Sequence, residues 1–144
     1  MRSVVLCVLM MIAATIVAEA PTSGQVAGAG GPECGPSGSA YMRTTLYFGT
    51  NKKSGGSVSN REWSNFLRDD VTTRFPQGFT VWEANGQWRL ADGRIQRERS
   101  KVLLVVHDDE TTVRARIAEI IGNYKESFEQ ESVLWETSRV CAAF

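Results

Sequence analysis

The sequence predicts an α+β domain whose elements follow the order βαββαβ, with an antiparallel sheet and two helices on one of its faces. Three observations lead to this prediction. Four segments carry the β-branched and aromatic residues, or the apolar runs, that are typical of strands. Two other segments repeat apolar residues at helical spacing. The third observation is a pair of cysteines, Cys34 and Cys141, which flank the first and the last strand.

The first 20 residues have the pattern of a signal peptide. Arg2 precedes the apolar run Val4–Val17, and the small-residue motif Ala18-Glu19-Ala20 follows it. The run is shorter than the roughly 20 apolar residues that a membrane-spanning helix needs. We therefore expect residues 1–20 to be cleaved and the mature protein to be exported, periplasmic or secreted, with no membrane anchor after cleavage.

Residues 21–40 are rich in Gly, Pro, Ser and Ala and have no hydrophobic period. Such a segment cannot bury enough apolar surface to order itself, so it predicts a flexible linker. A single α+β domain is expected over residues 41–144. Its first strand is indicated by the β-branched and aromatic segment 44–48, which ends at Gly49.

The first helix begins at a recognisable cap. Ser59 and Glu62 have the S-x-x-E spacing in which each side chain bonds the backbone of the other residue. The helix is expected to end at Phe75-Pro76, because proline cannot continue it. Its apolar face consists of Trp63, Phe66, Leu67 and Val71.

The middle of the chain predicts a hairpin with an extra bend. A second strand is expected over residues 78–84 and a third over 95–107. Asn85-Gly86 and Asp92-Gly93 are turn dipeptides that bracket the segment between them.

Asp108 or Asp109 is the expected cap of the second helix. A last strand is expected over residues 132–140. The resulting order is that of ferredoxin-like folds, in which the first and last strands are antiparallel neighbours. The apolar face of the second helix consists of Val113, Ile117, Ile120, Ile121, Tyr124 and Phe128.

Charge and cysteine content exclude several classes of function. Cleavage would leave Cys34 and Cys141 in an oxidising compartment, where a disulfide is expected, and the strand order places them at the same end of the sheet. Two distant cysteines and one histidine do not form a metal site, so neither metal nor cofactor is expected. The formal net charge is zero, which gives no reason to expect a nucleic acid as partner.

The open face of the sheet is unusually apolar for a surface in water. The segment 102–106 is apolar on both faces, and Tyr47, Trp82 and Trp135 have neighbours that are themselves partly apolar. We therefore expect something to cover this face. A second copy of the chain in a homodimer, the linker folding back, and a ligand remain open as the cover.

His107 is the weak catalytic candidate. It ends the third strand, Asp108 and Asp109 follow it, and a histidine can act as a general base. The alternative is a histidine that bonds a nearby carbonyl or helps to cap the next helix. No Ser/His/Asp or Cys/His set can be assembled from the order of the residues.

A weak ligand-binding candidate combines Arg74, Trp88 and Lys101. Trp88 stands between two turns, flanked by polar or basic residues, and its ring could serve as a platform for a carboxylate or a sugar-like ligand. The alternative is that Trp88 covers one end of the sheet. Arg74 and Lys101 would then pair with Glu83, Glu98 or Glu62.

Several spaced motifs resemble one bacterial family. They are Tyr47-Phe48-Gly49, Ser59-x-x-Glu62-Trp63, the segment 74–81 (RFPQGFTV), Gly86-Gln87-Trp88, Ser100-Lys101-Val102 and the segment 129–133 (EQESV). Together they resemble domain of unknown function 3574 over about residues 41–144. The resemblance implies an exported or envelope location, and it implies no activity.

The function expected first is a non-catalytic envelope module that binds a small molecule or a protein partner through the open face or the Trp88 patch. A small periplasmic enzyme in the manner of dimeric α+β barrels is the second expectation, with His107 or Arg74 assisting proton transfer. A structural or inhibitory interaction protein is the third. The sequence does not place this third function far below the first.

Overall fold

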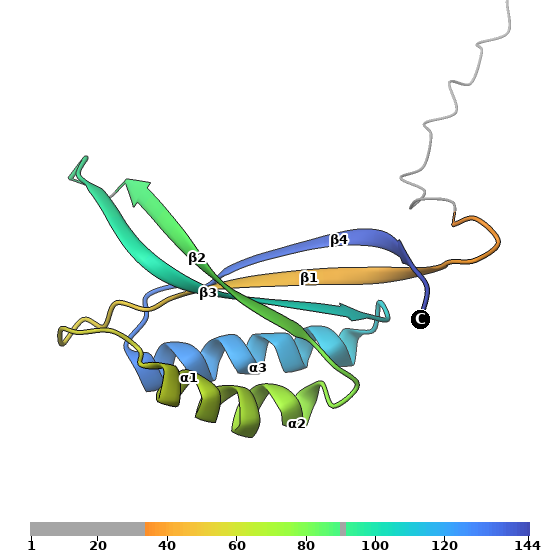
Figure 1. Ribbon diagram of the computed structural model, residues 1–144, viewed down its shortest axis with the longest axis horizontal. Helices are drawn as coiled ribbons and strands as arrows, with labels where there is room; N and C mark the ends of the chain where they lie inside the picture. Colours follow the sequence, from red (N-terminus) through yellow and green to blue (C-terminus); the bar gives the residue numbers. More distant parts are fainter. Residues whose placement is uncertain (1–33, 90–91) are drawn as a thin grey trace, which may run out of the picture.

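The computed structural model describes residues 34–89 and 92–144. The predicted signal peptide and the greater part of the predicted linker lie outside the described residues. Four strands form one antiparallel sheet in the order β2-β3-β1-β4. The predicted α+β class, with a four-stranded antiparallel sheet and two helical segments, is confirmed. In chain order the elements are β1 (Ser39–Gly49), α1 (Asn60–Phe66), η1 (Leu67–Val71), α2 (Thr72–Arg74), β2 (Thr80–Arg89), β3 (Ile95–His107), α3 (Thr111–Phe128) and β4 (Leu134–Ala142) (Figure 1).

Strand β1 lies inside the sheet, between β3 and β4. Its pairing with β4 runs from Ser39 opposite Ala142 to Tyr47 opposite Leu134. The first and last strands are therefore antiparallel neighbours, as predicted. At the start of β1 the predicted disulfide is present, joining Cys34 to Cys141 with their Cα atoms 5.4 Å apart.

Segments α1, η1 and α2 follow one another without a gap and together form the first predicted helix. The capping box is confirmed, because Ser59 Oγ accepts a hydrogen bond from the Glu62 N–H while the Glu62 carboxylate accepts one from the Ser59 N–H. The segment η1 is π-helical, which inserts one wider turn between the two α-helical parts. The helix ends before Phe75, which has a non-helical backbone.

Three local expectations are wrong. Asn85-Gly86 is not a turn, because β2 runs through both residues and Gly86 lies opposite Glu98 in the ladder with β3. The N-cap of α3 is Glu110, without a side-chain cap bond, whereas Asp109 pairs with Arg114. Strand β4 begins two residues later than expected and continues to Ala142.

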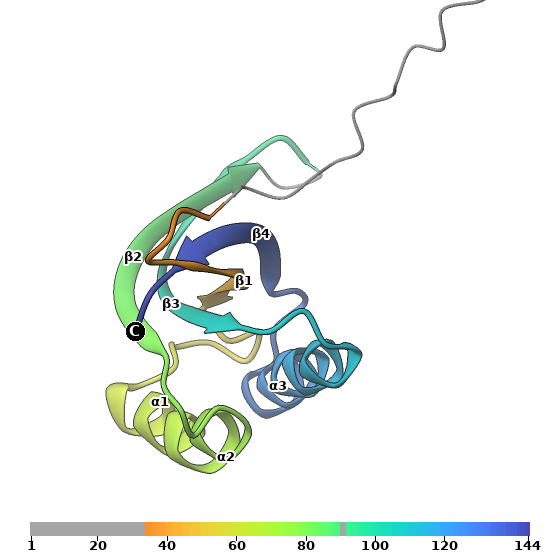
Figure 2. The same ribbon diagram turned by 90° about the vertical axis from the view of Figure 1, so that its right-hand side faces the viewer.

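The hydrophobic core lies between the sheet and the helices, which both cover the same face (Figure 2). Its centre is Tyr124 of α3, which is fully buried. The ring centroid of Tyr124 lies 4.5 Å from that of Phe48, 4.7 Å from that of Phe128 and 5.1 Å from that of Phe66. These aromatic contacts join β1, α1 and α3 and fix the helix layer against the sheet. None of the helices in the described segments is long and apolar enough to cross a membrane.

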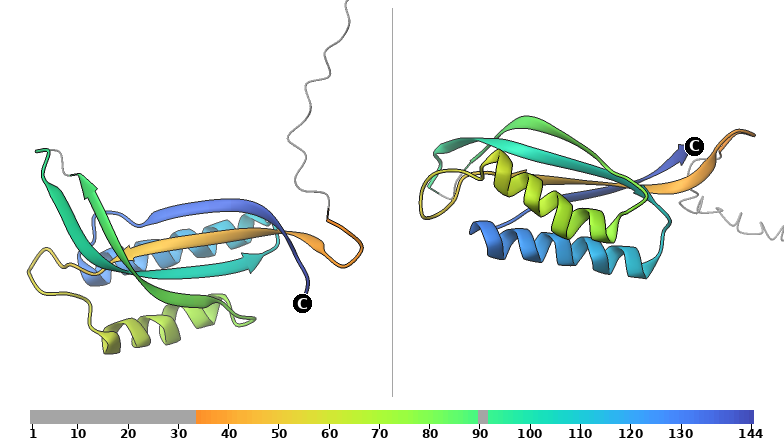
Figure 3. Two further views of the ribbon diagram at one scale, coloured as in Figure 1. Left: turned by 45° about the horizontal axis from the view of Figure 1, so that its top comes forward. Right: turned by 60° about the horizontal axis from the view of Figure 1, so that its bottom comes forward.

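The opposite face of the sheet carries the apolar row that the sequence predicted. Leu134, Tyr47, Val102 and Trp82 lie side by side across all four strands, as the strand registers require. Val102 is fully buried between its neighbours, whereas Trp82 is 43% and Leu134 61% exposed. Beyond this row the β2–β3 hairpin rises away from the helix layer (Figures 1 and 3). Trp135 does not belong to this face, because it is paired with Leu46 of the core.

Candidate functional site

A cavity of about 630 Å³ lies on the open face, at the end of the sheet where β1 stops. It is bounded by the β2–β3 hairpin on one side and by the start of β4 on the other. Two loops close its end: residues 50–58, between β1 and α1, and residues 129–133, between α3 and β4. The lining residues are Tyr47, Gly49, Asn51, Lys52, Lys53, Gly86, Gln87, Trp88, Gln96, Glu98, Ser100, Glu129, Gln130, Glu131, Ser132 and Leu134.

Two strand glycines line the cavity, and one of them, Gly49, leaves room for the carboxylate of Glu98. Gly86 lies directly opposite Glu98 on β2 and contributes no side chain. A Cβ atom built on Gly49 would collide with Oε1 of Glu98 and would lie 3.0 Å from Oε1 of Gln130. A glycine within a strand often marks a place where another group approaches the backbone closely. Here Gly49 leaves room for the carboxylate of Glu98, and Gly86 leaves room for the hydroxyl of Ser100, which would lie 3.2 Å from a Cβ built on Gly86.

The charge of Glu98 is not balanced by a nearby cation. Its Oε2 atom accepts a hydrogen bond from the backbone N–H of Asn51 at 3.3 Å, and no other residue of the described segments bonds or pairs with it. Burial raises the pKa of this carboxyl above its ordinary value, against the smaller lowering effect of the Asn51 bond. The cavity therefore contains one carboxylate that has no cationic partner among residues 34–89 and 92–144.

The other lining charges are already paired. Lys52 Nζ lies 2.6 Å from Oε1 of Glu62, and Lys53 Nζ lies 3.2 Å from Oε1 of Glu131. Glu129 accepts hydrogen bonds from both the N–H and the hydroxyl of Ser54, which lower its pKa. The bonds from Lys52 and Ser59 likewise lower the pKa of Glu62 to about 2.

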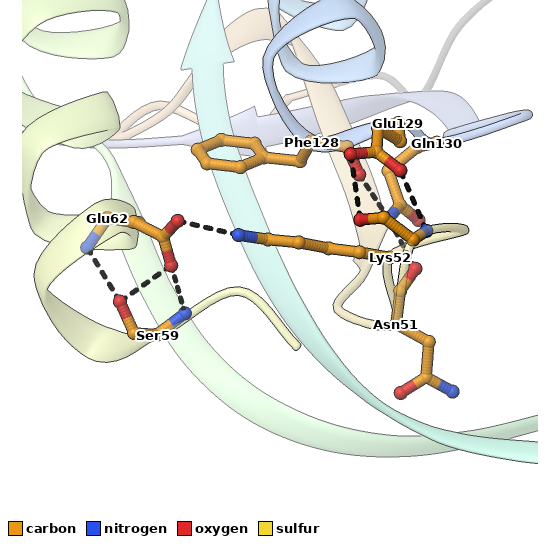
Figure 4. A network of polar contacts seen from close by, with 8 residues as sticks. Asn51, Lys52, Ser59, Glu62, Phe128, Glu129 and Gln130 are labelled. Atoms are coloured by element: carbon orange, nitrogen blue, oxygen red, sulfur yellow. Dashed lines mark hydrogen bonds and ion pairs between the residues drawn. The ribbon is translucent and has the colours of Figure 1, made fainter. Parts of the chain in front are cut away.

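The bonds of Ser54 to Glu129 and of Gln130 to Asn51 tie the two loops together at the end of the cavity (Figure 4). Gln130 Nε2 donates to the carbonyl oxygen of Asn51 at 2.7 Å and to that of Phe128 at 3.0 Å. The ammonium group of Lys52 lies 5.8 Å from the centroid of the Phe128 ring and reaches across to Glu62. The loop after β1 is thus held by residues that come 75 or more positions later in the sequence.

One wall of the cavity is aromatic and apolar. Trp88 on β2 is 41% exposed, and Leu134 on β4 is the most exposed member of the apolar row. The hydroxyl of Tyr47 is turned toward β4, where it donates to Oε1 of Glu136 at 3.0 Å, and this bond raises the pKa of the phenol. The wall can therefore contact the flat or hydrocarbon part of a small molecule, while Glu98, Gln96 and Ser100 offer polar contacts.

The structure does not bring together the three residues of the predicted Trp88 patch. Trp88 lines the cavity. Lys101 lies on the helix face, where it bonds Asn60 and pairs with Glu83. Arg74 lies at the end of the first helix and is held by Asp70 and Glu119. It borders a separate surface hollow. Lys101 thus has one of the partners that the alternative interpretation named, Glu83, whereas Arg74 pairs with two carboxylates that it did not name. Trp88 alone remains a candidate.

His107 lies at the end of the sheet far from the cavity, because it pairs with Met42 while the cavity adjoins Gly49. Its Nδ1 atom lies 2.7 Å from the carbonyl oxygen of Asp108, and its Nε2 atom lies 2.9 Å from Oγ1 of Thr44. A carbonyl can only accept, so Nδ1 carries a proton, and in the neutral ring Nε2 accepts from the threonine. Both ring nitrogens of the histidine are therefore occupied within the chain.

Among the lining residues that were not candidates in the sequence, Glu98 and Gln130 matter most for the site. The available signal was a glycine within a strand-like segment, Gly86, which was interpreted as part of a turn. The cross-strand register that sets Gly86 against Glu98 is a long-range property, and no local motif encodes it. Among the described residues, no group of three or more His, Cys, Asp or Glu side chains is placed to hold a metal ion.

Comparison with known proteins identifies the family. Residues 43–144 match the family described as "Protein of unknown function (DUF3574)". The chain belongs to this family. The resemblance to DUF3574 that the sequence indicated is thus confirmed, and no curated protein matches the chain.

Solved structures show that the DUF3574 chain shares its fold with an enzyme. A phage SAM lyase in complex with S-methyl-5′-thioadenosine matches with a TM-score of 0.50 at 15% identity, covering 78% of this chain and 95% of that chain. The same type of lyase in its apo state matches with a TM-score of 0.50 at 14% identity, covering 73% of this chain and 90% of that chain. At these identities the likeness is one of fold.

Proposed function

We propose that the protein is a non-catalytic binding module, exported to the periplasm or secreted, whose small-molecule ligand occupies the cavity beside Trp88. One observation carries the proposal: the floor of the cavity is kept clear by Gly49 and Gly86, while an exposed tryptophan forms its wall. Its volume of about 630 Å³ falls within the range of small-molecule sites.

The distribution of the family motifs supports the same site. Tyr47 and Gly49, then Gly86 to Trp88, then Ser100, and finally residues 129–132 all line the cavity. These are four of the motifs by which the sequence resembles the family, and they are far apart in the chain. Residues needed only for the core would gather on the helix face instead. Their meeting at a cavity on the open face favours a binding site.

Two further parts of the proposal concern fold class and location. We place the domain in the ferredoxin-like class, which the order βαββαβ and the strand order β2-β3-β1-β4 support. The disulfide between Cys34 and Cys141 supports an oxidising compartment, as the predicted signal peptide requires.

The catalytic alternative receives less support from the geometry. His107 and Arg74 lie outside the cavity, and their polar atoms bond groups of the chain itself. The fold shared with a phage SAM lyase does not decide the function, because one fold carries many activities. S-methyl-5′-thioadenosine nevertheless belongs among the molecules to be tested, since its purine could stack on an exposed indole.

The first test is native mass spectrometry of the full chain purified from the exported fraction. One spectrum reports cleavage, the disulfide, the number of subunits and any retained ligand. A library of small molecules, including S-methyl-5′-thioadenosine, is then screened by the shift that each produces in Tm. The comparison of interest is between Trp88→Ala and the matched control Trp82→Ala, because both indoles are exposed on β2 and only Trp88 lines the cavity.

We expect retained or added ligands to lose their effect in Trp88→Ala and to keep it in Trp82→Ala. Loss in Trp82→Ala alone would place the binding surface on the apolar row and contradict the proposal. A dimer without ligand, in which the open face is covered by a second copy, would also contradict it. Turnover of a bound molecule would establish the enzyme alternative.

A further inference from the structure

The amide of Gln130 has a fixed orientation in the cavity. Its Nε2 atom donates to two backbone carbonyl oxygens, those of Asn51 and Phe128, at 2.7 and 3.0 Å. Because carbonyl oxygens can only accept hydrogen bonds, the nitrogen must face them. The Oε1 atom of Gln130 is therefore the end that faces Gly49, as the distance of 3.0 Å from a Cβ built there shows.

A second acceptor points at the same place. Oε1 of Glu98 also lies against the position that a Cβ of Gly49 would take. The only bond that Glu98 makes within the described segments uses its other oxygen, Oε2, toward the Asn51 N–H. The Oε1 atoms of Glu98 and Gln130, which are both hydrogen-bond acceptors, thus converge above Gly49. No group in the described segments donates a hydrogen bond to either atom.

Converging acceptors repel one another unless a donor lies between them. A group that carries several N–H donors and a positive charge satisfies both oxygens and also balances the carboxylate. The lining lysines do not supply this group, because Lys52 is bonded to Glu62 and Lys53 to Glu131. The missing donor must therefore come from outside the described chain.

We infer that the cavity binds a primary amine in its protonated form, with the ammonium group donating to Oε1 of Glu98 and Oε1 of Gln130 above Gly49. This inference rests on the proposed function and names the class of ligand for that site. The carbon part of the amine lies against Trp88 and Leu134, the exposed apolar side chains of the same cavity. An indole beside the cation adds a favourable interaction of its own.

The test compares ligands that share a carbon skeleton and differ at the polar end. Binding of 2-phenylethylamine, 2-phenylethanol and the trimethylated amine to the full chain is measured by calorimetry near neutral pH, where the amine is charged. The alcohol has one donor and no charge, and the trimethylated ammonium has the charge without a donor. We expect the primary amine to bind at least about tenfold more tightly than either, because tenfold corresponds to about 1.4 kcal/mol and a hydrogen bond to a charged group is worth about that much or more.

The matching variants are Glu98→Gln and the control Glu131→Gln. Both remove one carboxylate that lines the cavity, but Glu131 is paired with Lys53 and is largely exposed. We expect Glu98→Gln to remove most of the preference for the amine over the alcohol, and Glu131→Gln to preserve it. If Glu98→Gln fails to fold, the three ligands on the unaltered chain still decide the question.

The outcomes separate this inference from the proposed function. If amine and alcohol bind equally, and Trp88→Ala removes both, the cavity is a binding site and the inference about the ammonium group is wrong. Equal binding would also fit a protonated Glu98 that donates to Gln130 itself. If none of the three binds at millimolar concentration, the inference is likewise wrong. If the amine binds and Trp88→Ala does not change its affinity, the amine binds elsewhere, and both the proposed site and the inference are wrong.

Discussion

The hydroxyl group of Tyr124 donates a hydrogen bond of 2.9 Å to the backbone carbonyl oxygen of Gly49. Tyr124 is the fully buried centre of the aromatic core, and Gly49 forms part of the cavity floor. Burial raises the pKa of the phenol, so the group keeps its proton and remains a donor at neutral pH. The core thus holds the residue around which the cavity is built.

Replacing Tyr124 by Phe should lower the free energy of unfolding by about 1 kcal/mol, the net value of a buried hydrogen bond. The ring and its aromatic contacts are retained, so the effect isolates the hydroxyl. Urea unfolding followed by circular dichroism measures it. Tyr47→Phe is the control, because its hydroxyl bonds Glu136 at the surface and its loss should cost within about 0.5 kcal/mol. If Tyr124→Phe and Tyr47→Phe lost the same free energy of unfolding, the buried bond to Gly49 would contribute no more to stability than the surface bond to Glu136.

Gly49→Ala should destabilise the protein and abolish ligand binding. The new Cβ would collide with Glu98 and would lie 3.0 Å from Oε1 of Gln130, so one or both side chains must move. Gly122→Ala is the matched control, since Gly122 is exposed on α3 with nothing within 4 Å of the added atom. That change should stabilise the chain by up to about 1 kcal/mol through helix propensity. Thermal unfolding measures both variants, and a neutral Gly49→Ala would argue against the crowded floor.

Glu62→Gln should destabilise the chain at neutral pH and have a smaller effect at pH 2. The bonds from Lys52 and Ser59 hold the pKa of Glu62 at about 2, below its ordinary value of 4.5. A carboxyl whose pKa is lowered in the folded state stabilises the fold at pH values above its ordinary pKa. This contribution is lost as the pH falls through the folded-state pKa of about 2. Glutamine preserves the capping box, so the change removes only the charge.

Chemical denaturation at both pH values tests this prediction. Glu131→Gln is the comparison, because its ion pair with Lys53 is exposed on both sides and should contribute little at either pH. A difference between Glu62→Gln and the unaltered chain that is as large at pH 2 as at neutral pH would contradict the assignment.

Glu98→Gln should raise Tm at neutral pH when no ligand is present. Burial raises the pKa of Glu98 above its ordinary value of 4.5, so ionising this group opposes folding. The gain in Tm from glutamine is therefore absent at pH values below the ordinary pKa of glutamate. It develops as the pH rises from there through the raised pKa of Glu98 in the folded state. Lys52 and Lys53 line the same cavity, but their ion pairs leave this sign unchanged. Thermal melts across this pH range measure the effect, and saturating 2-phenylethylamine should reverse it.

Removing the disulfide by the double change Cys34→Ser and Cys141→Ser should cost much of the stability. The bridge closes a loop with a sequence separation of 107 residues. The chain-entropy relation gives about 4 to 5 kcal/mol for a loop of this size. Urea unfolding of the double variant, compared with the oxidised chain, measures the loss. A loss below about 1 kcal/mol would show that the reduced chain is already compact when unfolded.

Much of the fold was readable from the sequence because its signals are local. The third strand has the predicted bounds, residues 95–107, and the Ser59 and Glu62 cap begins the first helix as predicted. The pairing of the first and last strands follows from their order together with the position of Cys34 and Cys141. Each of these features depends on spacing along the chain and not on distant contacts.

The site was less readable because its residues meet only through the register. Asn85-Gly86 is a dipeptide typical of turns. Strand β2 nevertheless continues through it, because β3 pairs with β2 without interruption there. Successive side chains of a strand point to opposite faces of the sheet. For this reason Lys101 on β3 points to the helix layer, whereas Trp88 on β2 points to the cavity. Whether a residue takes an odd or an even position in its strand decides which face it occupies. When a turn is predicted inside a strand, as at Gly86, the face of the residues after it cannot be assigned.

The disulfide and the cavity lie at opposite ends of β1. Ala40, beside Cys141, and Gly49 are nine residues apart along the strand, which corresponds to about 30 Å. A tag or surface linkage placed at the Cys34 end or at Phe144 therefore leaves the cavity facing away from the support (Figure 1). We therefore expect that a molecule immobilised through either of these positions would leave the cavity accessible to the proposed ligand from solution.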